Sequence, residues 1–397
     1  MTDFEATRRL FDLPEGVIYL DGNSLGPLPR TAAERVSHVM RAEWGGMLIG
    51  GWNEAGWMQA PARIGDRVGA LIGAAPGTVV MGDTLSIKVY QALASALEMR
   101  PDRRAVLSDT GNFPSDLYMA EGLIRSLGDR HKLRLVAPEA VEDAIDEHLA
   151  VVMLTEVDYR TGRLHDMKRI TERAHAAGAL VIWDLAHSAG ALPIDVTGAK
   201  ADFAVGCTYK YLNGGPGAPA FIYVAPEHAQ TARPALSGWL GHAAPFAFDL
   251  AYAPGRGIER MRVGTPPILA LAALDAALDG FDGVEMQEVR ARSIELSSLF
   301  IERVEASCPG LTLASPRDPT MRGSQVSFHA PDGYAIMQAL IANGVVGDFR
   351  APDIMRFGFT PLYVGREDVM RAADILRRVV EERIYEDPRF TKRAAVT

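Results

Sequence analysis

The sequence predicts an α/β fold in which a large domain with a mainly parallel sheet precedes a smaller C-terminal α+β domain. Apolar runs of strand length alternate with segments of helical period from about residue 79 to residue 224, the pattern of βαβ units. These runs are continuous, as expected for strands that are buried on both faces of a sheet. After the Gly- and Pro-rich stretch at 254–267 the pattern changes to long helices and isolated strands, which indicates a second domain.

Local signals place the elements of the large domain. Asp166 is positioned to cap a helix that runs to Ala177, and Gly178 closes it. Ligands of parallel sheets bind beyond the carboxyl ends of the strands, so residues at those ends are candidates for a site. Asp184 ends one apolar run, and we expect the run that begins at Ala201 to carry Lys210 at its end. The predicted strands cover residues 105–107, 151–154, 180–183, 201–207 and 220–224.

The remaining segments are assigned to a small domain and an arm. Two apolar helical faces occur late in the chain, one from Val289 to Val304 and one from Val369 to Val380, with strand-like segments at 325–328 and 355–359 between them. The first fifty or so residues have turn signals and a helix from about Thr31. We therefore expect an N-terminal arm at 1–50 that is part of the small domain, a large domain at 51–265 and a small domain at 266–397.

Composition restricts the class of protein. The chain has 397 residues, a formal net charge of −9 and no long basic run, which argues against nucleic-acid binding and favours small-molecule chemistry. Cys207 and Cys308 are the only cysteines and lack metal-ligand spacing, so we expect no metal site and a reducing, cytoplasmic location. No apolar stretch reaches the ~18 to 20 residues that cross a bilayer, and the first residues do not resemble a signal peptide.

Lys210 and Asp184 form the central candidate pair. A lone lysine is most often a solvated surface charge, but Lys210 lies between Tyr209 and Tyr211 and precedes a Gly-Gly-Pro-Gly loop that lets backbone approach a ligand. An amine in such surroundings can form a Schiff base with an aldehyde cofactor. Asp184 is by itself an ordinary residue for a strand end, yet a carboxylate there would keep the ring nitrogen of pyridoxal phosphate protonated.

Other candidates have equally plausible structural explanations. Phe113 and Asp116 lie in a turn after a strand and could contact a cofactor ring. Leu85 and Ser86 open a helical segment, whose backbone N–H groups suit a phosphate. His187 lies three residues after Asp184, and it is a candidate for contact with the cofactor only if Asp184 binds that cofactor. A strand arginine such as Arg356 is usually a surface residue, although its planar guanidinium could hold a substrate carboxylate.

With these residues considered together, the chain strongly resembles the kynureninases, which are fold-type-I pyridoxal-phosphate enzymes related to the class V aminotransferases. The resemblance covers nearly the whole chain, and the segments around Lys210 and the opening Gly22-Asn23-Ser24-Leu25-Gly26 are the most specific to this family. The lysine and aspartate alone would indicate only fold type I. The matching segments are Tyr19 to Gly26, Phe113 to Asp116, Asp184 to His187, Tyr209 to Asn213, Gly238 to His242 and Pro266 to Leu269.

The resemblance implies a role for each matching residue. Lys210 would carry the cofactor and move the α-proton, Asp184 would pair with the pyridine nitrogen, and Tyr209 is a candidate general acid. Arg356 would hold the substrate α-carboxylate, with Ser24 and the Trp52 region in the substrate pocket. Trp239 and Thr265 would reach a phosphate in the other subunit of a homodimer. The rest of the implied cofactor shell is Leu85, Ser86, Phe113, Asp116, Thr155, His187 and Tyr209.

The implied reaction is the hydrolysis of L-kynurenine to anthranilate and L-alanine in tryptophan catabolism, a branch connected with NAD biosynthesis. Animal kynureninases carry Asn where this chain has Thr265, and that Asn is tied to preference for the 3-hydroxylated substrate. The resemblance therefore implies a preference for L-kynurenine itself. Another class V enzyme, an aminotransferase or a cysteine desulfurase, is the alternative, and a catalytically silent cofactor-binding protein is a further one.

Overall fold

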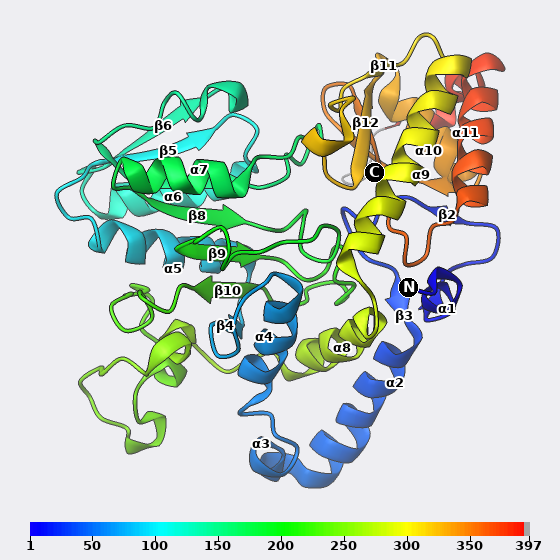
Figure 1. The fold of residues 1–397 in the computed structure, drawn as a ribbon. Helices are drawn as coiled ribbons and strands as arrows, with labels where there is room; N and C mark the ends of the chain where they lie inside the picture. The colour runs from blue at the N-terminus through cyan, green and yellow to red at the C-terminus, as the bar shows by residue number, and fades with distance from the viewer. Residues whose placement is uncertain (393–397) are drawn as a thin grey trace.

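A seven-stranded sheet forms the centre of the larger lobe of the molecule (Figure 1). In this computed structural model, which describes residues 1–392, the strand order is β4-β10-β9-β8-β7-β5-β6. Strands from β9 to β6 are parallel, whereas β10 runs antiparallel to both β4 and β9. The predicted α/β class with a mainly parallel sheet is therefore confirmed. The strands are β4 (Val79–Met81), β5 (Ala105–Asp109), β6 (Lys132–Val136), β7 (Leu149–Thr155), β8 (Leu180–Asp184), β9 (Phe203–Gly206) and β10 (Phe221–Val224).

Helices cover both faces of this sheet, which explains why its strands are continuously apolar. Successive residues of β7 point into two different cores, so that Val151 and Met153 pack on one side and Val152 and Leu154 on the other. As predicted, α7 begins after Asp166, whose side chain accepts a hydrogen bond from the backbone of Arg169. The covering helices are α5 (Leu85–Glu98) and α6 (Pro114–Ser126) on one face, and α4 (Ala60–Leu71) and α7 (Met167–Ala176) on the other.

The smaller lobe contains a four-stranded antiparallel sheet in the order β11-β12-β15-β14. The predicted helical face of α9 is buried, and its Phe300 ring lies 4.9 Å from the ring of Phe357 in β15. Helices α9 and α10 pack on this sheet, and α11 packs on those two helices. The elements are β11 (Thr312–Leu313), β12 (Gln325–His329), β14 (Asp348–Arg350), β15 (Ile354–Gly358), α9 (Met286–Ser307), α10 (Gly333–Ala342) and α11 (Arg366–Glu381).

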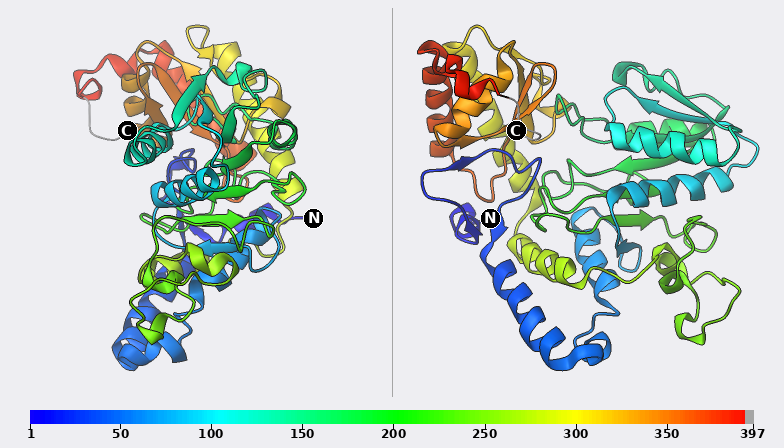
Figure 2. Two further views of the ribbon diagram at one scale, coloured as in Figure 1. Left: turned by 90° about the vertical axis from the view of Figure 1, so that its left-hand side faces the viewer. Right: turned by 180° about the vertical axis from the view of Figure 1, so that it is seen from behind.

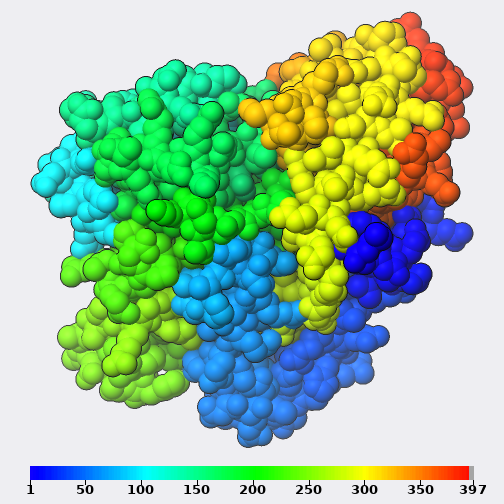
Figure 3. All heavy atoms as spheres, in the orientation of Figure 1, coloured from blue at the N-terminus to red at the C-terminus, as the bar shows by residue number. Residues whose placement is uncertain are grey.

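The N-terminal arm lies beneath the small lobe in the view of Figure 1, and Figure 2 shows the same arrangement from behind. Its strand β2 pairs in parallel with β13 of the small lobe, while α2 leads away from the arm and packs on α8. In Figure 3 the arm and α2 occupy the lower right of the surface, beneath the small lobe. The domain limits at residues 50 and 265 remain a prediction. The elements are α1 (Phe4–Arg8), β1 (Phe11–Asp12), β2 (Ile18–Tyr19), β3 (Leu28–Pro29), α2 (Arg30–His38), α3 (Gly51–Glu54), α8 (Ile268–Leu278) and β13 (Val345–Val346).

A buried aspartate joins three elements at the amino end of the sheet, opposite the end that carries Asp184. Asp202 Oδ2 lies 2.8 Å from His175 Nε2 and accepts the Val181 backbone N–H at 2.8 Å, and its Oδ1 lies 2.6 Å from His228 Nε2. Burial opposes ionisation of Asp202, but the hydrogen bonds from His175 and His228 lower its pKa overall. The same contact with Asp202 raises the pKa of His175.

We expect Asp202→Asn to destabilise the protein most between about pH 4 and pH 6.5. The ionised Asp202 stabilises the fold above its unfolded pKa of ~3.9, and this contribution is lost as the pH falls through the lower folded value. Protonated His175 stabilises it below ~6.5, and this contribution is lost as the pH rises through the raised folded value. Thermal unfolding at pH 5.5 should show an apparent Tm lower by roughly 2 to 5 °C, with a smaller difference at pH 8.5. An equal difference at both pH values would contradict this coupling.

Candidate active site

The structure corrects the placement of Lys210. Strand β9 ends at Gly206, so Lys210 lies in the loop that follows and not at a strand end. The chain turns there because of two hydrogen bonds of Thr208. Its hydroxyl donates to the carbonyl of Pro219 at 2.7 Å, and its own backbone carbonyl accepts the Gly214 N–H at 2.9 Å. The loop nevertheless carries the lysine to the carboxyl end of the sheet, where Nζ lies 3.2 Å from His187 Nε2.

The N-terminal arm supports the lysine loop from the other side. The Gly26 N–H donates to the carbonyl of Tyr209 at 2.7 Å. A Cβ at Gly26 would lie only 2.5 Å from the Lys210 carbonyl oxygen, so no larger residue fits this contact without a backbone shift. This close approach gives the glycine of the Gly-Asn-Ser-Leu-Gly motif a physical explanation.

Asp184 is a buried carboxyl that lacks a cationic partner within the described residues. Its Oδ1 accepts the Ala186 N–H at 2.8 Å, and its Oδ2 lies 3.5 Å from the Thr155 hydroxyl. Burial raises the pKa of Asp184, although the charge of Lys210 opposes the rise. A protonated ring nitrogen bound at this carboxyl would supply the missing positive charge, so the residue fits pyridoxal phosphate.

Further buried polar side chains at this end of the sheet have an atom without a hydrogen-bond partner in the part of the chain that the structure describes. They include Asp116, through Oδ2, and His187, through Nδ1. Burial and then the neighbouring Asp184 raise the pKa of Asp116 well above its usual range. Burial and then the charge of Lys210 hold the pKa of His187 well below its usual range, so its ring is neutral near pH 7. Buried polar atoms that lack a partner are expected where a polar ligand binds.

Asn112 is a residue that the sequence analysis missed. Its side-chain oxygen accepts hydrogen bonds from the Thr155 hydroxyl and, at 2.7 Å, from the Phe113 backbone N–H. It therefore ties Thr155, beside Asp184, to Phe113, whose ring centroid lies 5.9 Å from Lys210 Nζ. The Phe113 ring is 40% exposed and contacts Tyr159 edge-on at 5.1 Å, so one part of it stays open to a ligand. The Gly-Asn-Phe-Pro turn was the available signal for Asn112.

The start of α5 has the features of an anion site. Thr84 occupies the N-cap position but makes no side-chain capping bond, which leaves the N–H groups of Leu85 and Ser86 available. The Ser86 hydroxyl lies 3.0 Å from the hydroxyl of Ser115, in the first turn of α6. The two helix starts thus lie together and are suited to a phosphate.

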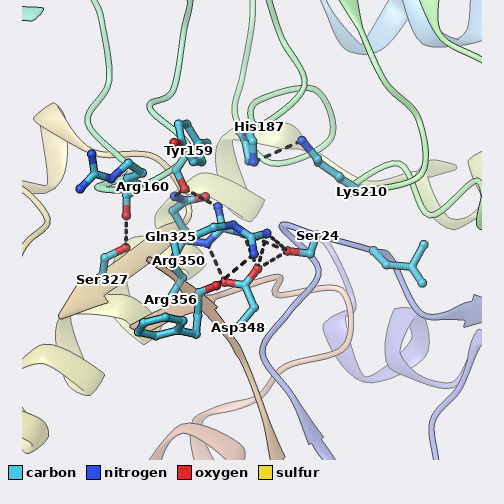
Figure 4. Close-up of polar contacts among 12 residues, drawn as sticks. Ser24, Tyr159, Arg160, His187, Lys210, Gln325, Ser327, Asp348, Arg350 and Arg356 are labelled. Carbon is cyan, nitrogen blue, oxygen red and sulfur yellow. Dashed lines mark hydrogen bonds and ion pairs between the residues drawn. The ribbon is translucent and has the colours of Figure 1, made fainter. Parts of the chain in front are cut away.

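Arg356 lies in β15 and is almost completely buried, within an ionic cluster that also contains Asp348 and Arg350 of β14 (Figure 4). Ser24 of the arm joins it, because its hydroxyl accepts from Arg356 Nη2 at 2.9 Å. The Arg356 Nη1 group also donates to the backbone carbonyl of Tyr159 in the large lobe. The structure therefore brings Ser24 and Arg356 together, as the substrate-pocket prediction requires.

The single chain does not bring the last three predicted residues to Lys210. Trp239 is 42% exposed in a short 3₁₀ turn (Trp239–Gly241), and Thr265 is also exposed. Trp52 lies in α3, at the lower end of the molecule in Figure 1, and its ring packs edge-on against Trp57 at 5.7 Å. Their predicted roles therefore depend on a second subunit.

The chain is similar to known proteins in its fold and in the sequence of its small lobe. The fold is similar to a cysteine desulfurase from Thermococcus onnurineus NA1, with a TM-score of 0.81, 20% identity and coverage of 96% of this chain and 99% of that one. A C-DES variant with glycine covalently linked to its PLP cofactor gives a TM-score of 0.79 at 19% identity, over 95% of this chain and 99% of that chain. Residues 289–376 match the family model of the kynureninase C-terminal domain.

Sequence relatives are much closer. A kynureninase from Burkholderia pseudomallei (strain 1106a) is 51% identical over 98% of this chain and 95% of that protein, and one from Pseudomonas fluorescens is 50% identical over the same shares. The fold, with its mainly parallel seven-stranded sheet and smaller second lobe, is that of the fold-type-I enzymes. Within that class, the chain belongs to the kynureninase family.

Proposed function

We propose that this chain hydrolyses L-kynurenine to anthranilate and L-alanine with pyridoxal phosphate as its cofactor. The observation that carries the proposal is the loop lysine Lys210, which lies beside His187 and whose charge acts on the buried carboxyl of Asp184, in a chain half identical to kynureninases. Within the described residues no helix is long and apolar enough to span a membrane, and no cluster of His, Cys, Asp and Glu could hold a metal.

The residues that would hold the cofactor surround Lys210. Asp184 pairs with the ring nitrogen, Phe113 packs on the ring, and the backbone of Leu85 and Ser86 binds the phosphate. When bound, pyridoxal phosphate supplies an electron sink for the bonds at the substrate's α and β carbons. The other members of the proposed shell are Asp116, Thr155, His187 and Tyr209.

Lys210 Nζ accepts the proton from the substrate's Cα. Its neighbour at 3.2 Å is the neutral ring of His187, which adds no positive charge and can accept a hydrogen bond from the protonated amine. Water then adds to the γ-carbonyl carbon, the Cβ–Cγ bond breaks to release anthranilate, and Cβ receives a proton. Lys210 finally returns a proton to Cα, which completes L-alanine. Tyr209 is the proposed acid for this stage: burial raises the pKa of its phenol, so the hydroxyl is protonated at neutral pH.

Arg356 orients the substrate through its α-carboxylate. Arg356 and Asp348 are almost completely buried, and a guanidinium in such surroundings binds a carboxylate far more strongly than one in water. Ser24 and the backbone of Tyr159 hold the guanidinium in place from two different parts of the chain. The carboxylate contact thus fixes which substrate bonds lie next to Lys210 and Tyr209.

A cytoplasmic homodimer completes the proposal, with Trp52, Trp239 and Thr265 entering the site of the other subunit. Large apolar side chains are exposed in two segments, which a second copy of the chain would cover. Those side chains are Met40, Trp44, Met47, Leu48 and Ile49 in the first segment, and Trp239, Phe246, Phe248, Leu250 and Tyr252 in the second.

The proposal is tested by anthranilate fluorescence with L-kynurenine and 3-hydroxykynurenine as substrates. We expect the protein to be yellow when purified, to release anthranilate from L-kynurenine, and to have a higher kcat/KM for L-kynurenine than for the hydroxylated compound because Thr265 replaces Asn. A yellow protein that releases no anthranilate would overturn the function. A higher kcat/KM for 3-hydroxykynurenine would overturn the preference alone.

The resemblance in fold to cysteine desulfurases does not favour that activity here. A desulfurase needs a mobile, reactive cysteine, whereas both cysteines of this chain are buried. Burial raises the pKa of the Cys207 thiol, and its sulfur lies 4.0 Å from the carbonyl oxygen of Ala186. Cys308 follows the end of α9 in the small lobe, where burial also raises its pKa.

A further inference from the structure

Two arginines share one buried carboxylate beside the proposed reaction centre. Asp348 and Arg350 belong to β14, and Arg356 lies opposite Asp348 in β15. Asp348 Oδ1 accepts a hydrogen bond from Arg356 Nε at 2.6 Å, and its Oδ2 lies 2.8 Å from Arg350 Nη2. Figure 4 shows both guanidinium groups converging on Asp348 and Ser24.

Arg356 has little donor capacity left. A guanidinium carries five N–H groups, and four of those on Arg356 are engaged, two by Asp348, one by Ser24 and one by the carbonyl of Tyr159. Its side chain is only 1% exposed. A carboxylate that binds through two parallel N–H donors can therefore use only one from Arg356, unless an existing hydrogen bond of Arg356 breaks.

Arg350 can supply the second donor. Its side chain is 34% exposed, and within residues 1–392 its Nε makes no hydrogen bond, while Nη1 donates to the carbonyl of Phe349 at 3.1 Å. Its Nη2 group lies 3.3 Å from Ser24 Oγ, the atom that also contacts Arg356. Arg350 is thus anchored through Nη1 and Nη2, and its Nε is the donor that remains open.

The charge of the cluster favours an anion. Two guanidinium groups face the carboxylate of Asp348 and a second carboxyl, Asp21, which is ionised only in part near pH 7 because burial and then the neighbouring Asp348 raise its pKa to about 7. The excess positive charge lies near His187, since both arginines contribute to the low pKa of that ring after burial and Lys210. A buried cluster with excess charge is stabilised by a ligand of the opposite sign.

We propose that Arg350 binds the α-carboxylate of the amino-acid substrate together with Arg356, and that Asp348 orients both guanidinium groups. The inference rests on the proposed function only in requiring an α-amino acid as the substrate. The two arginines select acids over amides of the same shape, because a neutral amide does not balance the charge of the cluster.

The test is equilibrium binding to the holoenzyme. L-Alanine and its α-carboxamide, which the proposed hydrolysis does not consume, are titrated against wild type and Arg350→Met, and the absorbance of the bound cofactor reports binding. We expect Arg350→Met to weaken binding of the acid by about 10- to 100-fold and to change binding of the amide by less than twofold. Arg366→Met is the matched control: Arg366 pairs with Glu295 at the exposed start of α11, so this variant should bind both ligands like wild type.

Each outcome decides the inference. Equal weakening of acids and amides, no weakening, or a wild type that does not prefer acids would overturn it. Arg350→Lys keeps the charge without the forked geometry, and it should weaken acid binding by a smaller factor even if Arg350→Met fails to fold. Acid selectivity that depends on Arg350 in a wild type that releases no anthranilate would refute the proposed function and leave this inference standing.

Discussion

Replacing Lys210 by alanine is expected to lower the rate of anthranilate release by ~10⁴-fold or more, because the variant loses both the covalent attachment of the cofactor and the base for the α-proton. The fold should persist, since the lysine lies in a loop at the surface of the sheet's carboxyl end. The measurement is the initial rate of anthranilate fluorescence, together with the absorption spectrum before and after borohydride. Borohydride should fix the cofactor irreversibly to wild type but not to Lys210→Ala.

Two variants serve as comparisons for Lys210→Ala. Lys168→Ala changes an exposed lysine of α7 and should keep the wild-type rate. Tyr209→Phe removes only the proposed acid, and we expect its rate to fall by ~10²- to 10⁴-fold with the cofactor still attached. Full turnover in Tyr209→Phe would refute the role of the tyrosine, and near-normal turnover in Lys210→Ala would refute the whole mechanism.

Replacing Asp184 by asparagine is expected to lower kcat on the order of 10²- to 10³-fold, the cost of removing one partner of a buried ion pair. The amide has almost the same shape, and it can still accept the Ala186 N–H that Asp184 Oδ1 now accepts. It cannot keep a ring nitrogen protonated. The electron sink is therefore weakened while the site keeps its geometry.

The second measurement for Asp184→Asn is cofactor affinity, determined by titrating the apoprotein and following absorbance. We expect weaker binding and a shifted absorption band, because the buried carboxylate no longer balances the charge on the ring. Asp143→Asn, on the surface of the large lobe, is the control and should match wild type in both measurements. Unchanged affinity, spectrum and kcat in Asp184→Asn would show that this carboxyl does not contact the cofactor.

The elements predicted from periodicity agree with the structure because burial on both faces leaves a direct mark on the sequence. β7 and β8 read as unbroken apolar runs, and α7 shows its cap at Asp166 and its terminal Gly178. The predicted end of the strand before Lys210 was wrong because Cys207 and Thr208 are buried in the same way as strand residues. Hydrogen bonds that link Thr208 to Gly214 and Pro219 nevertheless turn the chain away from the sheet. Burial alone does not distinguish a strand from a buried loop.

The sequence by itself determined the sheet, the helices on its two faces and the local motifs that hold Lys210 and Asp184, because each depends on residues close together in the chain. Only the tertiary structure decided the composition of the ionic cluster around Arg356, in which Ser24 comes from one end of the chain and Asp348 and Arg356 from the other. It also decided that Arg350 shares Asp348 and that Asn112 joins Phe113 to Thr155. Side-chain contacts between distant segments depend on how the lobes pack, and neither periodicity nor motif spacing carries that information.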